Sequence, residues 1–124
     1  MATILVAEDD ADIRDLIVFK LEQIGHTVVP VGDGRSALSK AHDQAPDIVL
    51  LDVMMPGMSG IDVCRELRKD QQTAELPIIL LTARAQERDV SVGLAAGADD
   101  YIVKPFSPRV LADRVQSVLT RART

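Results

Sequence analysis

Short apolar runs alternate along the chain with segments of helical periodicity. Five of these runs are rich in aliphatic residues, which is typical of strands covered on both faces of a sheet. The predicted strands are residues 4–7, 26–31, 48–51, 78–81 and 101–103. The second run contains Pro30, which cannot donate a hydrogen bond to a neighbouring strand. We therefore expect that strand at an edge of the sheet.

A segment of helical pattern follows each predicted strand, although residues 86–96 are Ala-rich and only weakly periodic. In residues 12–24 one apolar face is formed by Ile13, Leu16, Ile17, Leu21 and Ile24, and Gly25 is expected to end the helix. Asp33 is a candidate N-terminal cap for the second helix, and Ser107-Pro108 has the composition of a helix start. The other helices are predicted around residues 61–67 and 86–96, the latter closed by Gly97.

Five strand–helix units in succession predict an α/β fold. We expect a doubly wound (βα)5 domain of the flavodoxin-like type, with a five-stranded parallel sheet of order 2-1-3-4-5 and helices on both faces. The length of 124 residues suits a single domain over residues 1–124. Such a domain could stand alone or be excised from a longer protein.

Composition and charge narrow the classes of function. The formal net charge of −5 and the pI of about 4.9 argue against direct nucleic-acid binding, which needs a basic surface. Cys64 is the single cysteine, so the chain forms no internal disulfide, and a reduced, cytoplasmic setting is expected. No apolar run approaches the roughly 18 residues that span a membrane, so no membrane association is expected.

Chemically active side chains stand where the predicted strands end. The first strand is followed by Glu8, Asp9 and Asp10, and the third by Asp52. The fourth and fifth strands are followed by Thr82 and Lys104. In open parallel sheets, ligands bind beyond the carboxyl ends of the strands, where the strand order switches. We therefore expect several carboxylates to converge there, beside a hydroxyl and an ammonium group.

This combination of groups indicates phosphoryl transfer to an aspartate. Clustered carboxylates repel one another unless a cation lies among them, and Mg²⁺ prefers such hard oxygen ligands. An aspartate beside the metal can accept a phosphoryl group, and we predict Asp52 as that acceptor. Lys104 would neutralise phosphoryl oxygens and Thr82 would donate a hydrogen bond to one of them. Asp10 also suits a simpler role as a helix cap, and Tyr101 suits a core position.

The same residues closely resemble the receiver domain of two-component response regulators. The matching stretches are ILVAEDD at 4–10, LLDVMMPG at 50–57, LTA at 81–83, GADDY at 97–101 and KPF at 104–106. The resemblance covers the whole chain and implies that Asp52 is the phosphoacceptor. It also implies that Asp9 and Asp52 bind Mg²⁺ (or Mn²⁺) directly, Glu8 through a water molecule, and Met54 through its backbone carbonyl.

The resemblance further implies a switching mechanism. Thr82 and Lys104 would hold the phosphoryl group, and Tyr101 would swing inward when Thr82 moves toward it. The Lys104–Pro105 peptide bond is expected to be cis. The phosphoryl donor would be a phosphohistidine on a histidine kinase or a histidine phosphotransfer protein. The chain would catalyse only its own phosphorylation and dephosphorylation.

The signal would be read on the surface of the fourth helix, fifth strand and fifth helix, by a downstream effector domain or protein. The chain would be a monomer or a phosphorylation-dependent dimer. Asp100 and Arg114 match part of the charged pattern through which many family members dimerise, whereas Val90, Val110 and Gln116 depart from it. Met54 and Arg84 occupy positions that tune the lifetime of the phosphoryl group in the family.

Two other classes of function are considered. A haloacid-dehalogenase-like phosphatase also uses a strand-end aspartate with a hydroxyl, a lysine and Mg²⁺. It needs a second aspartate two residues after the nucleophile, and here that position is Met54. A phosphorylation-independent binding module is the other alternative, but every side chain expected for phosphoryl acceptance is present.

Overall fold

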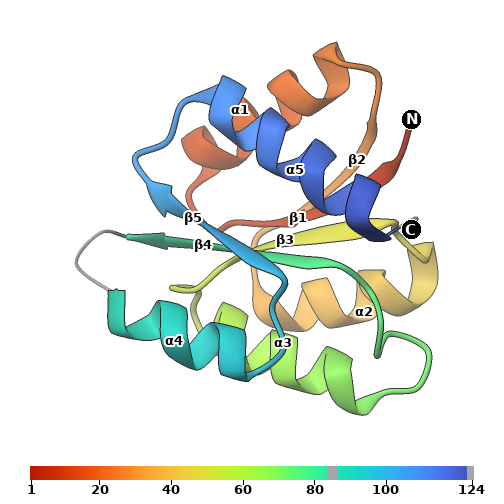
Figure 1. Ribbon diagram of the computed structural model, residues 1–124, viewed down its shortest axis with the longest axis vertical. Helices are drawn as coiled ribbons and strands as arrows, with labels where there is room; N and C mark the ends of the chain where they lie inside the picture. The colour runs from red at the N-terminus through yellow and green to blue at the C-terminus, as the bar shows by residue number, and fades with distance from the viewer. Residues whose placement is uncertain (84–86, 123–124) are drawn as a thin grey trace.

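Strands and helices alternate strictly along the chain (Figure 1). The computed structural model describes residues 1–83 and 87–122. Its elements, in chain order, are β1 (Thr3–Ala7), α1 (Ala11–Gln23), β2 (Thr27–Val31), α2 (Gly34–Gln44), β3 (Ile48–Asp52), α3 (Gly60–Lys69), β4 (Ile78–Ala83), α4 (Glu87–Ala95), β5 (Asp100–Lys104) and α5 (Pro108–Ala122). The predicted (βα)5 succession is confirmed.

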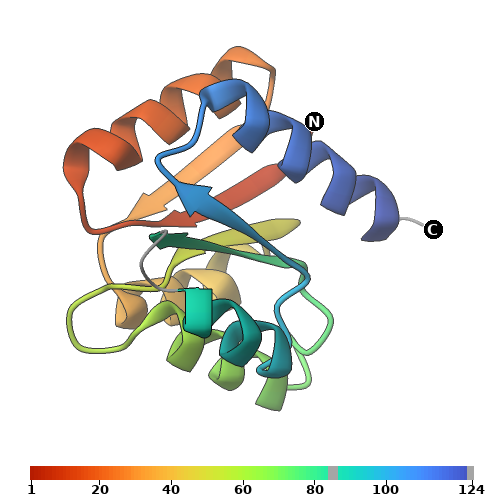
Figure 2. The ribbon, with the colours of Figure 1, turned by 60° about the vertical axis from the view of Figure 1, so that its left-hand side comes forward.

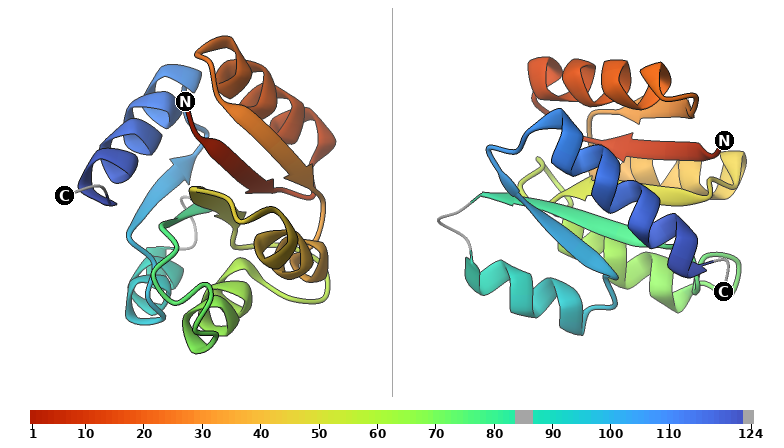
Figure 3. Two further views of the ribbon diagram at one scale, coloured as in Figure 1. Left: turned by 90° about the vertical axis from the view of Figure 1, so that its right-hand side faces the viewer. Right: turned by 45° about the horizontal axis from the view of Figure 1, so that its top comes forward.

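The strands form one parallel sheet between two layers of helices. The strand order is β2-β1-β3-β4-β5, as predicted. Helices α1 and α5 cover one face, and α2, α3 and α4 cover the other (Figures 2 and 3). Pro30 lies in β2, opposite Val6 of β1, so the proline stands in an edge strand as expected.

Alternate residues of each strand enter two separate aliphatic cores. On β3, for example, Ile48 and Leu50 belong to the core under α1 and α5, whereas Val49 and Leu51 belong to the core under α2, α3 and α4. This alternation follows from the two-residue period of a strand. Both faces of the central strands are therefore fixed by packing, which holds the strand ends in place.

The apolar face predicted for α1 is wrong in two of its members. Ile17 and Leu21 are buried, and Ile13 packs against the same core. Leu16 and Ile24, however, are 44% and 43% exposed. The helix packs against β1, β2 and α5 at one side of the sheet, where only the stripe through residues 13, 17 and 21 faces the core. Leu16 and Ile24 lie beside that stripe.

Local features at the ends of helices agree with the sequence. Asp10 is the N-terminal cap of α1, because its carboxylate accepts hydrogen bonds from the N–H groups of Asp12 (2.9 Å) and Ile13 (3.1 Å). Asp33 caps α2 by accepting from the N–H of Ser36 at 2.8 Å. The Lys104–Pro105 bond is cis, as expected. The two aspartate caps fix the positions at which α1 and α2 begin, next to the carboxyl edge of the sheet.

Gly60 allows α3 to begin against the end of β3. Its N–H donates to the carbonyl of Val53 at 3.0 Å. A Cβ atom at this position would lie 2.3 Å from the backbone oxygen of Asp52 and 2.9 Å from its carbonyl carbon. No side chain fits there without moving the backbone that carries Asp52.

We expect Gly60→Ala to destabilise the protein by roughly 2 kcal/mol or more, because the added methyl group overlaps backbone atoms that cannot turn away. Urea unfolding followed by circular dichroism measures this change. Gly57→Ala is the matched control: Gly57 has a positive φ of 78° but open space around it. That variant should lose only about 1 kcal/mol from backbone strain. Equal losses in the two variants would contradict the close-packing argument.

Candidate functional site

The predicted site residues meet at the carboxyl edge of the sheet. Asp52 and Lys104 are the last residues of β3 and β5, and Thr82 is the last but one of β4. Glu8 directly follows β1, which pairs with β3. The connections after β1 and β3 leave toward opposite faces of the sheet, so the edge between them stays open.

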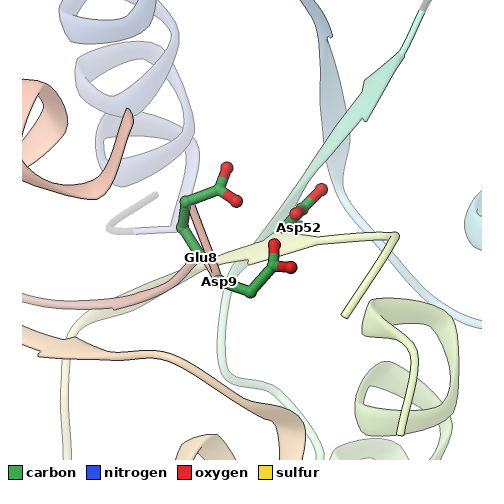
Figure 4. Close-up of side chains that lie close together, drawn as sticks. All are labelled: Glu8, Asp9 and Asp52. Atoms are coloured by element: carbon green, nitrogen blue, oxygen red, sulfur yellow. The ribbon is translucent and has the colours of Figure 1, made fainter. Parts of the chain in front are cut away.

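Three carboxylates gather in this opening, as Figure 4 shows. One oxygen from each of Glu8, Asp9 and Asp52 lies within 4.8 Å of the other two. Glu8 is fully buried at 0% exposure and Asp52 is 4% exposed, whereas Asp9 is exposed to solvent. The cluster therefore has two desolvated carboxylates at its base and a third at its mouth.

Lys104 is the counter-charge of the two buried carboxylates. Its Nζ lies 2.6 Å from Oε1 of Glu8 and 3.1 Å from Oδ1 of Asp52. The N–H of Met54 also donates to Oδ1 of Asp52, at 3.4 Å. One ammonium group faces three carboxylates, so the cluster keeps an excess of negative charge when all three are ionised.

The electrostatics of Asp52 reflect this excess. Burial, followed by the hydrogen bond with Glu8 and the negative charge of Glu8, raises the pKa of Asp52 to about 7, although Lys104 acts in the opposite direction. Burial alone would lower the pKa of Lys104, but Glu8 and Asp52 together raise it above its usual range. The ammonium group therefore stays charged at neutral pH, and Asp52 holds a proton readily when no other cation is near.

The donor set fits a divalent cation that prefers oxygen ligands. Within residues 1–83 and 87–122, Oε1 of Glu8 is a buried side-chain oxygen that is balanced by Nζ of Lys104, at 2.6 Å. Buried carboxylate oxygens are normally hydrogen-bonded or bound to a cation. Three carboxylates at one open edge form the kind of hard, acidic pocket that Mg²⁺ occupies.

Thr82 lies beside the acidic cluster but on the other face of the sheet from Asp52 and Lys104. It is 2% exposed and pairs with Val103. Its side chain shares a face with Leu80 and Tyr101, because residues alternate along β4 and β5. Its hydroxyl donates to the carbonyl of Ala83 at 3.4 Å, a long hydrogen bond. Tyr101 is half-buried against the core of that face.

The charged residues expected at a dimer surface interact within the chain. Arg114 contacts Oδ1 of Asp100 at 2.9 Å and donates to the carbonyl of Tyr101 at 2.8 Å. Val110 is exposed and apolar. Arg84 lies outside the described residues, so its expected role has no structural counterpart here.

Sequence reasoning did not identify two residues that shape the site. Arg14 of α1 donates to the backbone carbonyl of Glu8 at 2.8 Å and so holds the start of the acidic loop. Gly60 sets the distance between α3 and Asp52. In the sequence, Arg14 is one polar position of a helical pattern and Gly60 has the composition of a turn. Neither residue type indicates by itself a role at the site.

The chain belongs to the family of response regulator receiver domains, whose family model matches residues 4–116. It is 46% identical over 118 residues to the phosphate regulon transcriptional regulatory protein PhoB of Escherichia coli, covering 95% of this chain and 52% of PhoB. It is 48% identical over 118 residues to the DNA-binding response regulator MtrA of Mycobacterium leprae, covering 95% of this chain and 51% of MtrA. The chain thus spans about half the length of the curated relatives it matches.

Solved structures agree with the fold. The chemotaxis protein CheY4 of Vibrio cholerae superimposes with a TM-score of 0.89 at 35% identity, over 95% of this chain and 98% of CheY4. The family and the fold favour neither the phosphatase nor the phosphorylation-independent alternative. None of the helices in the described part of the chain is long and apolar enough to cross a membrane. The expected absence of nucleic-acid contact is not confirmed, since MtrA is named a DNA-binding regulator.

The raised pKa of Asp52 predicts how stability depends on pH in the absence of metal. The folded state binds the proton of Asp52 more tightly than the unfolded state does. This contribution is present below the ordinary aspartate pKa and is lost as the pH rises toward about 7. We expect the free energy of unfolding in EDTA to fall over this range, and Asp52→Asn to be more stable than wild type at pH 8 by roughly 1–3 kcal/mol.

Chemical denaturation at several pH values, with and without Mg²⁺, measures these changes. Added Mg²⁺ should raise the stability of the wild type at pH 8 and have a much smaller effect on Asp52→Asn. Glu66→Gln is the control, because Glu66 forms only an ion pair with Lys69 on the outside of α3. A wild-type pH dependence that survives unchanged in Asp52→Asn would refute the assignment of the proton to this site.

Proposed function

We propose that this receiver domain is a phosphoryl-accepting signalling switch whose acceptor is Asp52. The observation that carries the proposal is the placement of this carboxylate: it is buried at a strand end, beside Glu8 and Asp9, with Oδ1 3.1 Å from Nζ of Lys104. The donor is a phosphohistidine on a histidine kinase or a histidine phosphotransfer protein. Membership of the receiver family supports this choice of donor.

Phosphoryl transfer forms one bond and breaks another. An oxygen of Asp52 attacks the phosphorus atom, the phosphorus–nitrogen bond breaks, and the electron pair stays on the imidazole, which takes up a proton. Lys104 stabilises the negative charge on the phosphoryl oxygens, and the hydroxyl of Thr82 donates a hydrogen bond to one of them. Water later hydrolyses the acyl phosphate, which releases inorganic phosphate and restores the carboxylate of Asp52. The chain therefore acts catalytically only on itself.

Asp9, Asp52 and the backbone carbonyl of Met54 would hold Mg²⁺, or Mn²⁺ in its place, with Glu8 acting through a water molecule. The bound ion supplies positive charge against both the carboxylates and the phosphoryl oxygens. The cluster of three carboxylates supports this site. Met54 cannot serve as the general acid that a haloacid-dehalogenase-like phosphatase would need after its nucleophile, which argues against that alternative.

The phosphorylated domain would signal through the surface of α4, β5 and α5 to an effector domain or protein. The relatives are about twice as long as this chain, which supports a regulator in which residues 1–124 form the receiver. The net charge of −5 favours contact with DNA, if any, by another domain. We further propose that the protein is cytoplasmic. It would be a monomer, or a dimer that forms on phosphorylation. Because Asp100 pairs with Arg114 within the chain, a charged dimer would have to exchange this pair.

Incubation with acetyl phosphate and Mg²⁺ tests the proposal directly. Intact-mass measurement should find one acid-labile phosphoryl adduct on the wild type, and none in EDTA. Asp52→Ala should form no adduct, whereas the control Asp47→Ala, altered at the opposite edge of the sheet, should be labelled like the wild type. Labelling of Asp52→Ala at the wild-type level would move the acceptor to another residue.

Thr82→Ala separates phosphoryl acceptance from switching. The variant should still form the adduct, because Asp52 and the acidic cluster are intact. Tyr101 fluorescence should respond less to phosphorylation than in the wild type, since the variant lacks the hydroxyl that would link the phosphoryl group on Asp52 to Tyr101. Thr82→Ser keeps that hydroxyl and should retain the response. A full Tyr101 response in Thr82→Ala would show that Thr82 does not couple the two sites.

A further inference from the structure

Arg68 joins four segments of the chain at the edge of the sheet opposite to the acidic cluster. Its Nε donates to the carbonyl of Gly97 at 3.0 Å, and its Nη1 to the carbonyls of Leu76 (2.6 Å) and Thr73 (3.4 Å). Its Nη2 contacts Oδ2 of Asp99 at 3.1 Å. One guanidinium group thus connects α3, the α3–β4 connection, the end of α4 and the start of β5.

The C-terminal end of α4 is built to present a carbonyl to this group. Ala98 donates to the carbonyl of Gly93, and Gly97 donates to the carbonyl of Leu94, each at 3.1 Å. These two bonds and the φ of +112° at Gly97 define a Schellman motif. The carbonyl of Gly97 then lies outside the helical hydrogen bonds and accepts from Arg68. A Cβ atom on Gly97 would come within 2.8 Å of Cγ of Arg68, so the two residues are closely packed.

Other contacts hold the same end of the helix. A Cβ atom on Gly93 would lie 2.1 Å from Cδ1 of Leu80, so the helix backbone packs directly on β4. Sγ of Cys64 lies 3.7 Å from the carbonyl of Ala96. The carboxylate of Asp99 that contacts Arg68 also accepts from the N–H of Ile78 at 2.8 Å. Directly after the last turn of α4, the chain thus accepts hydrogen bonds from two side chains of α3, at residues 96 and 97.

The opposite end of α4 lies on the side of the acidic cluster. Strand β4 ends at Ala83, next to Thr82, and α4 is the next element along the chain. Figure 1 shows α4 running back from that edge toward the C-terminal end of α3, which carries Arg68. One end of the helix is therefore near the phosphoryl site, and the other is held by a network of directional bonds.

We propose that Arg68 is a positioning residue that makes the C-terminal end of α4 a fixed pivot, so that phosphorylation of Asp52 displaces mainly the N-terminal half of the helix. Thr82 and Tyr101 share the sheet face that α4 covers, so a change at Thr82 reaches the helix from that face. Because the C-terminal end is held, we expect this local change to tilt the helix about that end. The pivot rests on the proposed function, but the anchoring of α4 by Arg68 does not.

Amide hydrogen exchange of the unphosphorylated protein tests the anchor. Arg68→Ala should speed exchange at Gly97 and Ala98 by about tenfold, beyond any change at Leu5 in the centre of the sheet, which reports global unfolding. Arg65→Ala is the matched control on the same helix, since Arg65 is an exposed arginine that forms an ion pair with Asp62, at 3.7 Å.

Arg68→Lys guards against a failure of Arg68→Ala to fold. It keeps the positive charge but not the planar fork, so it should change exchange at Gly97 and Ala98 in the same direction by a smaller factor. If exchange at Gly97 and Ala98 changed only by the same factor as exchange at Leu5 in both Arg68 variants, the proposed anchoring of α4 by Arg68 would be overturned.

Beryllium fluoride with Mg²⁺, a stable mimic of the phosphoryl group, tests the pivot. In the wild type, amide chemical shifts should change at Val90 and Val92 several-fold more than at Ala96 and Ala98. In Arg68→Lys the changes should extend to Ala96 and Ala98, while the change at Asp52 itself stays the same. Equal changes at both ends of α4 in the wild type would overturn the pivot. No change at Asp52 in the wild type would count against the proposed function, and the exchange measurement would still decide the anchor.

Discussion

The burial of two carboxylates around one ammonium group is the constraint on which this structure depends. Glu8 and Asp52 are withdrawn from water, and Nζ of Lys104 lies within 3.1 Å of both. Desolvated like charges are stable only when a proton or a cation balances them. The raised pKa of Asp52 is the response of the protein to this condition. Any ligand that changes the charge at the edge therefore changes the stability of the fold with it.

The fold holds this unfavourable arrangement because its strand ends cannot separate. Side chains of β1, β3 and β4 are buried on both faces, in two aliphatic cores with few aromatic residues. The close packing of Gly60 in α3 against the carbonyl of Asp52 further restricts movement of the Asp52 backbone. The packed strand ends keep the charges together at this edge. Such a site suits a switch better than a flexible pocket would.

The sequence predicted most of this edge, because strand-end residues in a parallel sheet must share one side of the molecule. The continuous aliphatic runs located the end of β3 to within one residue and the end of β4 to within two, and hence placed Asp52 and Thr82 at the carboxyl edge. The helical pattern was less reliable, since Leu16 and Ile24 satisfy the period but fall beside the buried stripe of α1. Arg14 and Arg68 could not be assigned, because each binds backbone carbonyls whose positions depend on tertiary packing.

In the proposed switch, Lys104 would have to balance the charge of both the buried carboxylates and the phosphoryl group. In the metal-free protein it balances Glu8 and Asp52 together. A phosphoryl group on Asp52 would replace the single charge of the carboxylate by about −1.5 to −2 charges, more than one ammonium group can balance while it remains bound to Glu8. The adduct therefore requires a second cation near Glu8 and Asp9, and an additional donor for its oxygens. Thr82 is the hydroxyl residue of β4, and it faces the side of the sheet that α4 covers. The shortage of positive charge at the edge is thus what would draw Thr82 toward the phosphoryl group and carry the signal through the sheet.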